Sequence, residues 1–181
     1  MSVLKPVDPA TATGESKEVL QIAEQRLKRV PAMIRVFANS PAITRLYFQF
    51  NETFQHTKMT PRLRGLIAAA IAEFHGCDYS LSAAMALGPR EGVSEAELTA
   101  ARRGEANDPQ TAAALRFALA VAKERGQVPA AQTEELRKAG FTDEEIVELI
   151  AAVVLVTFRS YVNLVAGTEV DFPLVRTNKA A

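Results

Sequence analysis

The sequence predicts an all-α protein, because its start signals, its stop signals and its hydrophobic spacing are those of helices. Ser40-Pro41, Thr60-Pro61 and Asp108-Pro109 each place a capping side chain before a proline at the first helical position. SEAE at 94–97 and TDEE at 142–145 are capping boxes. No segment alternates apolar and polar residues between hairpin turns, so we expect no sheet. One stripe shows the helical period of three to four: Ile43, Leu46, Tyr47, Phe50 and Phe54.

These signals divide the chain into ten predicted helices. Gly104, Gly126 and Gly140 stand where three of them should stop. In order along the chain, the helices are expected at 16–29, 31–38, 41–57, 61–75, 77–88, 95–103, 109–125, 130–139, 143–157 and 159–167.

Length and composition are those of one compact domain. With 181 residues, 48% of them hydrophobic, the chain can bury one substantial core. We therefore expect an amino-terminal arm at 1–15, a single helical domain at 16–172 and a carboxyl-terminal tail at 173–181. Both arms are expected either to be loose or to dock on a partner subunit.

The charge balance and the single cysteine limit the classes of binding partner and the cellular compartment that we expect. Lys plus Arg and Asp plus Glu both number 21, so no basic field is available to bind nucleic acid. One cysteine cannot form an internal disulfide, which favours a reducing compartment. The amino terminus lacks an apolar signal region, and the run LIAAVVLVTF at 149–158 is about half the length that crosses a bilayer. We expect a cytoplasmic protein that binds neither membrane nor nucleic acid.

A short repeat suggests two related helical hairpins. LIAA occurs at 66–69 and again at 149–152, an offset of 83 residues, and each copy is expected to be an apolar helix, a break and a second short helix. The same offset relates Gly65 to Glu148. Chance similarity between two alanine-rich helices explains the repeat equally well.

One stretch carries a family resemblance. From Met59 to Leu98 the chain reads MTPRLRGLIAAAIAEFHGCDYSLSAAMALGPREGVSEAEL, with a capped helix beginning PRLR, a G-C-x-Y turn, an alanine-rich helix and then G-[VL]-S-E-x-E-L. This stretch, and the later run from Phe141 to Pro173, resembles the alkylhydroperoxidase D and carboxymuconolactone decarboxylase family. The resemblance implies an all-helical fold, a homodimer, trimer or hexamer, and peroxidase or antioxidant activity of the peroxiredoxin type.

The same resemblance implies which residues stand at the active site. Peroxidases of the family use a glutamate, a C-x-x-C pair twelve residues later and a histidine four residues after the second cysteine. By position these groups fall on Gly65, Cys77, Ser80 and Ala84. Only the first cysteine is present, so the resemblance implies a degenerate active site whose thiol cannot form the family's internal disulfide.

The chemistry of Cys77 is open to more than one interpretation. At a helix amino terminus the macrodipole favours a thiolate, whereas the neighbouring charges of Glu73 and Asp78 oppose it. The alternatives are an inert buried cysteine, a single reactive thiol that needs an external reductant, and a redox-sensing or ligand-contact role. His75 serves as a general base only if Gly76 breaks the helix and brings the imidazole over the thiol; otherwise it is a capping or surface residue.

A second group of candidates depends on the repeat. Glu148 lies in an apolar turn, where a buried carboxyl would have a raised pKa, although a solvent-facing glutamate on an amphipathic helix is the favoured alternative. Tyr79, Tyr161 and Asn163 would flank the same pocket and bind a small polar ligand, but aromatic packing explains the two tyrosines equally well. Arg159 could hold a ligand carboxylate. Two distant histidines and one cysteine make no metal site, and we expect no cofactor.

Three functions follow from these readings. The first is a family-type antioxidant oxidoreductase, with Cys77, Ser80, His75 and Glu148 as candidate catalytic residues. The second is a cofactor-free, decarboxylase-like lyase that performs acid–base chemistry on a small lactone or carboxylic acid. The third is a non-catalytic oligomeric binding protein.

Overall fold

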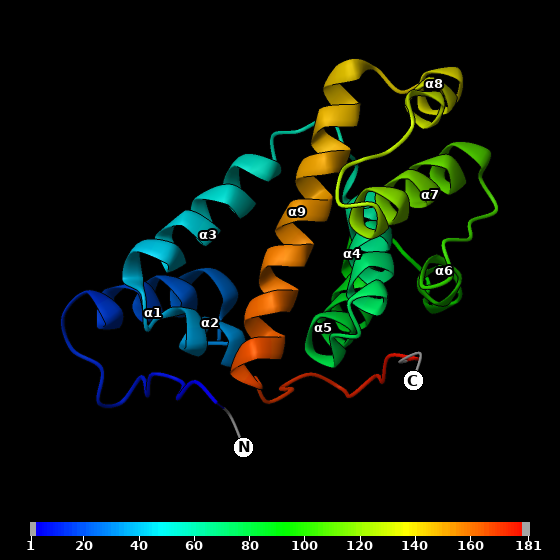
Figure 1. Cartoon of the computed structure of the whole chain (residues 1–181). Coiled ribbons are helices and arrows are strands. Elements are labelled where there is room, and N and C mark those ends of the chain that lie inside the picture. The colour runs from blue at the N-terminus through cyan, green and yellow to red at the C-terminus, as the bar shows by residue number, and fades with distance from the viewer. Residues whose placement is uncertain (1–2, 179–181) are drawn as a thin grey trace. The chain divides into compact units, whose positions relative to one another are not determined.

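A computed structural model describes residues 3–178, and over that range the chain is helical with no strand (Figure 1). The all-α prediction is confirmed. The elements are α1 (Gly14–Leu27), α2 (Ala32–Phe37), α3 (Pro41–Phe54), α4 (Pro61–Phe74), α5 (Asp78–Leu87), the 3₁₀ helix η1 (Gly88–Glu91), α6 (Glu95–Ala101), α7 (Pro109–Lys123), α8 (Ala130–Lys138) and α9 (Asp143–Ala166).

Two of the three predicted cap–proline pairs form a capping bond, whereas Ser40 precedes α3 without a side-chain capping bond. The Thr60 hydroxyl accepts the Leu63 N–H at 3.2 Å, and the Asp108 carboxylate accepts the Thr111 N–H at 2.7 Å. Each of these bonds satisfies a backbone donor that the first helical turn leaves free. Both predicted capping boxes form, at Ser94 with Glu97 and at Thr142 with Glu145.

The end of the chain's helical part differs from the prediction. The helices expected at 143–157 and 159–167 are one continuous helix, α9. No glycine or proline interrupts residues 143–166, so nothing in the backbone ends the helix near Arg159. The second copy of the repeat therefore lacks the break and the second short helix that the hairpin interpretation requires.

Helix α9 is also longer than the run at 149–158 indicated. Within its 24 residues, an 18-residue window with a mean hydropathy of 1.9 passes the length and composition test for a membrane span, and 44% of that window is buried inside the protein. The core helix of a soluble protein passes the same test, so this feature is weak support for a membrane span.

The chain forms two compact units, and each is described by itself. The first consists of the described part of Met1–His56 together with Val162–Asp171. Its amino-terminal arm pairs with its own chain, since Val7 and Arg35 exchange hydrogen bonds at 2.9 and 3.2 Å. Asp171 accepts the Ala32 N–H at 2.9 Å. The single domain at 16–172 stays a prediction.

The second unit consists of Thr57–Tyr161 and the described part of Phe172–Ala181, and α4 is its central helix. Residues 65–72 of α4 are all buried, and α5, α6, α7 and η1 pack against this helix. Four alanines among those residues let the neighbouring helices approach closely. The tail is also held here, because Ser82 Oγ accepts the Val175 N–H at 2.9 Å. Both arms therefore contact their own chain.

Candidate functional site

The single cysteine lies in the turn between α4 and α5. Gly76 adopts a φ of +64°, a left-handed conformation that ends α4 and that glycine adopts without strain. Cys77 is then the N-cap residue of α5, and its Sγ accepts the Ser80 N–H at 3.4 Å. A sulfur thus takes the capping role that a hydroxyl or carboxylate usually fills.

Ser80 joins the thiol to a buried chain of hydroxyl groups. The Cys77 thiol donates to Ser80 Oγ at 3.3 Å, and Ser160 Oγ of α9 donates to the same oxygen at 3.1 Å. Cys77 is 1% exposed, and both serines are buried as well. The candidate residues Cys77 and Ser80 are therefore neighbours in space, and Ser160 joins them. An attacking molecule reaches this thiol only if the surrounding structure opens.

The two carboxylates beside Cys77 are both occupied by partners. Glu73 pairs with Arg102 at 2.8 Å, with side chains 11% and 14% exposed, and it also accepts the Asn178 N–H at 2.7 Å. Asp78 accepts the Thr177 N–H and hydroxyl at 2.9 and 2.8 Å. The opposition to a thiolate that the sequence predicted for Glu73 and Asp78 is thus reduced by their partners.

The pKa of Asp78 reflects these contacts. Partial burial acts to raise it, but the hydrogen bonds from Thr177 and the pairing with Arg176 outweigh that effect and lower the pKa below its ordinary value. Tail residues 175–178 are therefore tied to the first turns of α5 and to the end of α4 through charged groups that flank the thiol.

His75 does not lie over the thiol as a general base would. Its Nε2 forms a hydrogen bond with Thr157 Oγ1 at 2.9 Å, and its ring meets that of Tyr161 edge to face at 4.9 Å. Burial lowers the pKa of His75, so the imidazole is neutral at physiological pH. Gly76 breaks the helix, but the ring turns toward α9. The structure brings His75 together with Tyr161, not with Cys77.

The remaining ligand candidates, Tyr79 and Asn163, belong to different units. Tyr79 is buried and its ring contacts Phe172 edge to face at 5.7 Å. Asn163 belongs to the other unit, where it is 3% exposed; no hydrogen-bond partner for its side-chain amide occurs within residues 3–178. Their roles in ligand binding stay predictions.

Glu148 holds a loop. Its carboxylate accepts the N–H groups of Lys58 and Met59 at 3.1 and 3.2 Å. Thr157, the partner of His75, is nine residues further along α9, which corresponds to about 13 Å of helix rise. Glu148 is therefore not brought to the Cys77 turn, and its carboxylate fixes the approach to α4.

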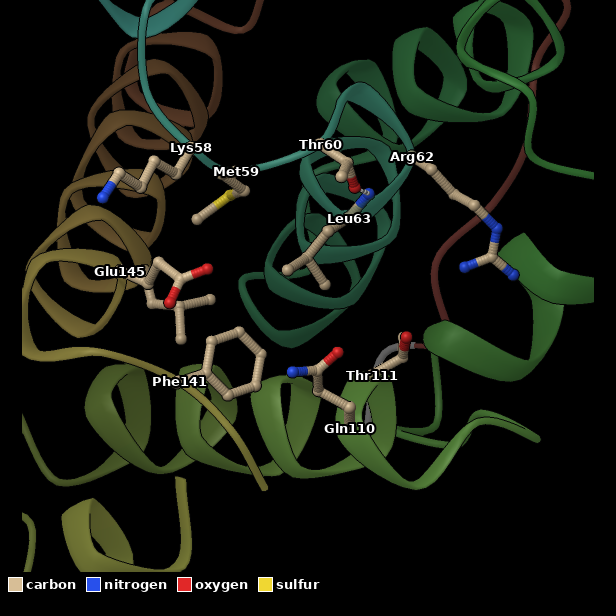
Figure 2. Close-up of a pocket in the computed structure, with 10 residues that line it drawn as sticks. Lys58, Met59, Thr60, Arg62, Leu63, Gln110, Thr111, Phe141 and Glu145 are labelled. Atoms are coloured by element: carbon tan, nitrogen blue, oxygen red, sulfur yellow. Dashed lines mark hydrogen bonds between the residues drawn. The ribbon is translucent and has the colours of Figure 1, made fainter. Parts of the chain in front are cut away.

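A cavity of about 120 Å³ lies beside that loop (Figure 2). Figure 2 shows the side chains of Met59, Leu63 and Phe141 converging on it, below the amino-terminal end of α4. Its Glu145 carboxylate accepts the N–H and the hydroxyl of Thr142, both at 2.8 Å. None of the residues predicted at the site lines this cavity; Glu148 only anchors its rim.

Glu91 is the residue that sequence reasoning missed. A Cβ built on Gly65 would lie 2.5 Å from Glu91 Oε2, so this carboxylate, carried by η1, occupies the space beside α4 that a side chain at position 65 would need. The signal available in the sequence was Gly65 itself, since an isolated glycine in an apolar helix often marks the close approach of another group.

The charges around Glu91 form a cluster. Burial raises its pKa, and the nearby positive charges of Arg64 on α4 and Arg159 on α9 act in the opposite direction without cancelling that rise. The Nε of Arg159 is buried, and no hydrogen-bond acceptor for it is found in the described part of the chain. The arrangement combines a carboxyl that stays protonated to higher pH than usual with an unused guanidinium donor.

Comparison with known families agrees with this architecture. Residues 41–124 match the Carboxymuconolactone decarboxylase family. This segment is therefore similar to the carboxymuconolactone decarboxylase family, as the sequence resemblance predicted. No curated protein matches the chain at a significant level.

Several solved structures share the fold of this chain. A peroxidase-related protein from Ralstonia eutropha, described as an alkylhydroperoxidase AhpD core, has a TM-score of 0.79 at 21% identity, over 93% of this chain and 92% of that one. A peroxidase-related protein from a Silicibacter species has a TM-score of 0.79 at 18% identity, over 92% and 89% of the two chains. A cysteine-to-alanine variant of the debrominase Bmp8, in complex with 2,3,4-tribromopyrrole, has a TM-score of 0.78 at 19% identity, over 94% and 92%. The predicted alkylhydroperoxidase D-like fold is confirmed.

Proposed function

We propose that the protein is a one-cysteine thiol oxidoreductase that reduces small peroxides at Cys77 with the help of an external thiol. The observation that carries this proposal is the position of the sulfur at the amino terminus of α5, where the Ser80 N–H points at it. A backbone donor and the helix macrodipole both favour a negative charge at this point.

The reaction needs two stages because Ser80 cannot supply a second sulfur. The Cys77 thiolate attacks one peroxide oxygen, the O–O bond breaks, and the departing alkoxide takes up a proton, which leaves a sulfenic acid. A small thiol then attacks that sulfur, releases water and forms a mixed disulfide. A second thiol attacks the mixed disulfide, which regenerates Cys77 and yields the oxidised small thiol.

Two comparisons support this class of chemistry. Solved proteins of the same fold are called peroxidase-related, and one is a debrominase whose structure with 2,3,4-tribromopyrrole was obtained on a cysteine-to-alanine variant. A cysteine at the centre of the site is compatible with both names. Because Cys77 is buried, we expect turnover to be slow and limited by local opening of the turn.

The test is the consumption of an alkyl hydroperoxide in the presence of excess small thiol. We expect slow catalysis that is lost in Cys77→Ser. Ser80→Cys should allow an internal disulfide and raise the rate when the external thiol is scarce. Equal peroxide consumption by the wild-type protein and Cys77→Ser would overturn the proposal.

A cytoplasmic location and a homodimer, trimer or hexamer are part of this proposal. A reducing cytoplasm supplies the external thiol that a lone cysteine requires. The acid–base lyase and the non-catalytic binding protein remain as alternatives. If peroxide leaves Cys77 unoxidised while the protein still binds small molecules, the function is one of those two.

A further inference from the structure

The cavity at the start of α4 takes no part in the thiol chemistry. It has a volume of about 120 Å³ and lies at the end of the helix opposite to Cys77, since the 14 residues of α4 correspond to about 20 Å of helix rise. We propose that this cavity binds a small neutral phenol, with the ring on its apolar side chains and the hydroxyl group on Glu145. Such a site would exist whether or not Cys77 is reactive.

Apolar side chains form the inner wall of the cavity. Met59 comes from the loop before α4, Leu63 from the first turn of that helix, Phe141 from the segment before α9, and Leu149 from α9. Met59, Phe141 and Leu149 are buried, so core packing holds the wall in place. Figure 2 shows Met59, Leu63 and Phe141 directed toward the same space. A phenyl ring suits these neighbours, because aromatic rings pack edge to face and attract a thioether sulfur.

The size of the cavity selects a single ring. An apolar cavity of about 150 Å³ can hold one benzene molecule. The cavity here measures about 120 Å³, and its rim is exposed at Lys58, Thr60 and Gln110, so a ligand reaches it from solvent. One six-membered ring therefore fits with its substituent at the rim, whereas two fused rings are too large.

Two polar side chains face the same space and would orient the ligand (Figure 2). Glu145 receives the N–H and the hydroxyl of Thr142 on Oε2, which leaves Oε1 able to accept another hydrogen bond. These two bonds lower the pKa of Glu145, so at neutral pH its carboxyl is ionised and accepts only. A phenol hydroxyl is a donor for such an oxygen. Figure 2 shows the Gln110 amide directed toward the ring of Phe141, where it can contact the ligand's oxygen.

The other charged groups at the cavity are already paired. The Lys58 ammonium lies 2.6 Å from the Glu144 carboxylate, and the Arg62 guanidinium pairs with Glu97. Figure 2 shows both cationic ends directed away from the apolar wall. An anion would therefore meet the Glu145 carboxylate without an unpaired cation among the described residues that line the cavity. A neutral phenol meets no such repulsion.

The experiment is an NMR titration of the full-length protein with phenol, followed through the backbone amide signals. We expect saturable shifts at Leu63 and Phe141, no shift at Cys77, and a dissociation constant of about 0.1–1 mM for so small a ligand. Benzene should bind several-fold more weakly because it lacks the hydroxyl donor. Benzoate should bind about tenfold more weakly because of its charge, and 1-naphthol should not bind because of its size.

Two variants test the wall and the polar group separately. In Leu63→Phe the larger side chain should fill the cavity and abolish phenol binding. Glu145→Gln keeps the capping box with Thr142 but removes the charge, so phenol should bind several-fold more weakly and benzoate more tightly than in the wild-type protein. Glu95→Gln removes the same charge from the first turn of α6, which does not line the cavity, and this matched control should leave both affinities unchanged.

Several results would overturn this proposal. They are the absence of saturable shifts with phenol, shifts centred on Cys77, wild-type affinity for phenol in a folded Leu63→Phe variant, and equal affinities in Glu145→Gln and Glu95→Gln. Benzoate binding as tightly as phenol to the wild-type protein would also contradict it. If Leu63→Phe fails to fold, the comparison of Glu145→Gln with Glu95→Gln still decides the outcome.

Discussion

The two ends of α4 differ in how completely their polar groups are satisfied. At the carboxyl-terminal end, Cys77, Ser80 and Ser160 form a closed set of hydrogen bonds, and the flanking Glu73 and Asp78 have their own partners. At the Gly65 end, a carboxyl has a raised pKa and a guanidinium nitrogen has no acceptor in residues 3–178. Unsatisfied buried groups cost folding energy, so the two ends of α4 contribute differently to stability.

This difference shows that a vacant position in a motif is not the same as an absent chemical group. The family pattern places a glutamate at position 65, where this chain has glycine. The structure places the carboxyl of Glu91, from a different element, in that very space. At position 84, where the family resemblance implies a histidine, the chain has a buried alanine.

The largest expected effect tests the satisfied end. Arg102→Ala breaks a nearly buried ion pair and leaves the Glu73 charge short of a partner, so we expect the free energy of unfolding to fall by about 3 kcal/mol. Urea denaturation measures the change. Arg103→Ala, which removes an exposed ion pair with Glu105, is the control and should have a small effect. Equal losses in the two variants would contradict this account of the thiol end.

A smaller loss of folding stability is expected in Asp78→Asn, because this change weakens the hydrogen bonds between the tail and α5. Three contacts from Thr177 and Arg176 are affected, and we expect a loss of about 1–2 kcal/mol. Opening of the tail should also speed the alkylation of Cys77 by iodoacetamide, read by mass spectrometry. The control is Thr99→Val, whose hydroxyl takes no part in the tail's hydrogen bonds; its Cys77 should be alkylated at the wild-type rate. If Cys77 in Asp78→Asn is also alkylated at the wild-type rate, the tail does not restrict access to the thiol.

The pH dependence of Asp78 follows from its lowered pKa. The stabilisation is fully present above the ordinary carboxyl pKa of the unfolded chain and is lost as pH falls through the lower folded-state value. Stability measured from about pH 6 downward should therefore decline less steeply in Asp78→Asn than in the wild-type protein. If stability falls with pH in the same way in both proteins, Asp78 does not contribute to the pH dependence of stability.

The pH dependence of stability that comes from Glu91 should have the opposite sign to that from Asp78, and it should be smaller. Because its folded-state pKa is raised, its contribution to stability is present at low pH and lost as pH rises through that value. Relative to the wild-type protein, Glu91→Gln should gain stability as pH increases, because the glutamine has no charge to bury. Thermal unfolding of both proteins at several pH values checks this, and a difference that stays constant with pH would contradict it.

The sequence predicted most of the fold, since helix boundaries depend on local signals. Caps such as Thr60 and Asp108 act within one turn, and their effect is visible without any tertiary contact. The break expected in α9 was wrong. It followed from the hairpin repeat, whereas the sequence there contains no helix breaker. The 3₁₀ helix η1 was missed because it continues directly from α5.

The candidate site was harder to predict, because it depends on long-range packing. The contact of Cys77 with Ser80 joins residues three positions apart at a helix start, so it is local in the sequence. The partners of His75 and Glu148 come from segments 82 and 90 residues away, and no local pattern specifies them. Glu91 on η1 lies against Gly65 on α4, and the two residues are separated in the chain by α5. Only the tertiary structure therefore reveals this contact.

The most direct test of the central claim is an NMR titration of the Glu91 side-chain carboxyl in wild-type protein and in Arg159→Gln. We predict a midpoint above that of an ordinary glutamate in the wild-type protein, because burial disfavours the charged form. The midpoint should rise further in Arg159→Gln, since the arginine's charge lowers the pKa of Glu91. If the Glu91 carboxyl titrates with the midpoint of an ordinary glutamate, and Arg159→Gln leaves that midpoint unchanged, then Glu91 is a solvated surface residue and not a buried carboxyl beside Gly65.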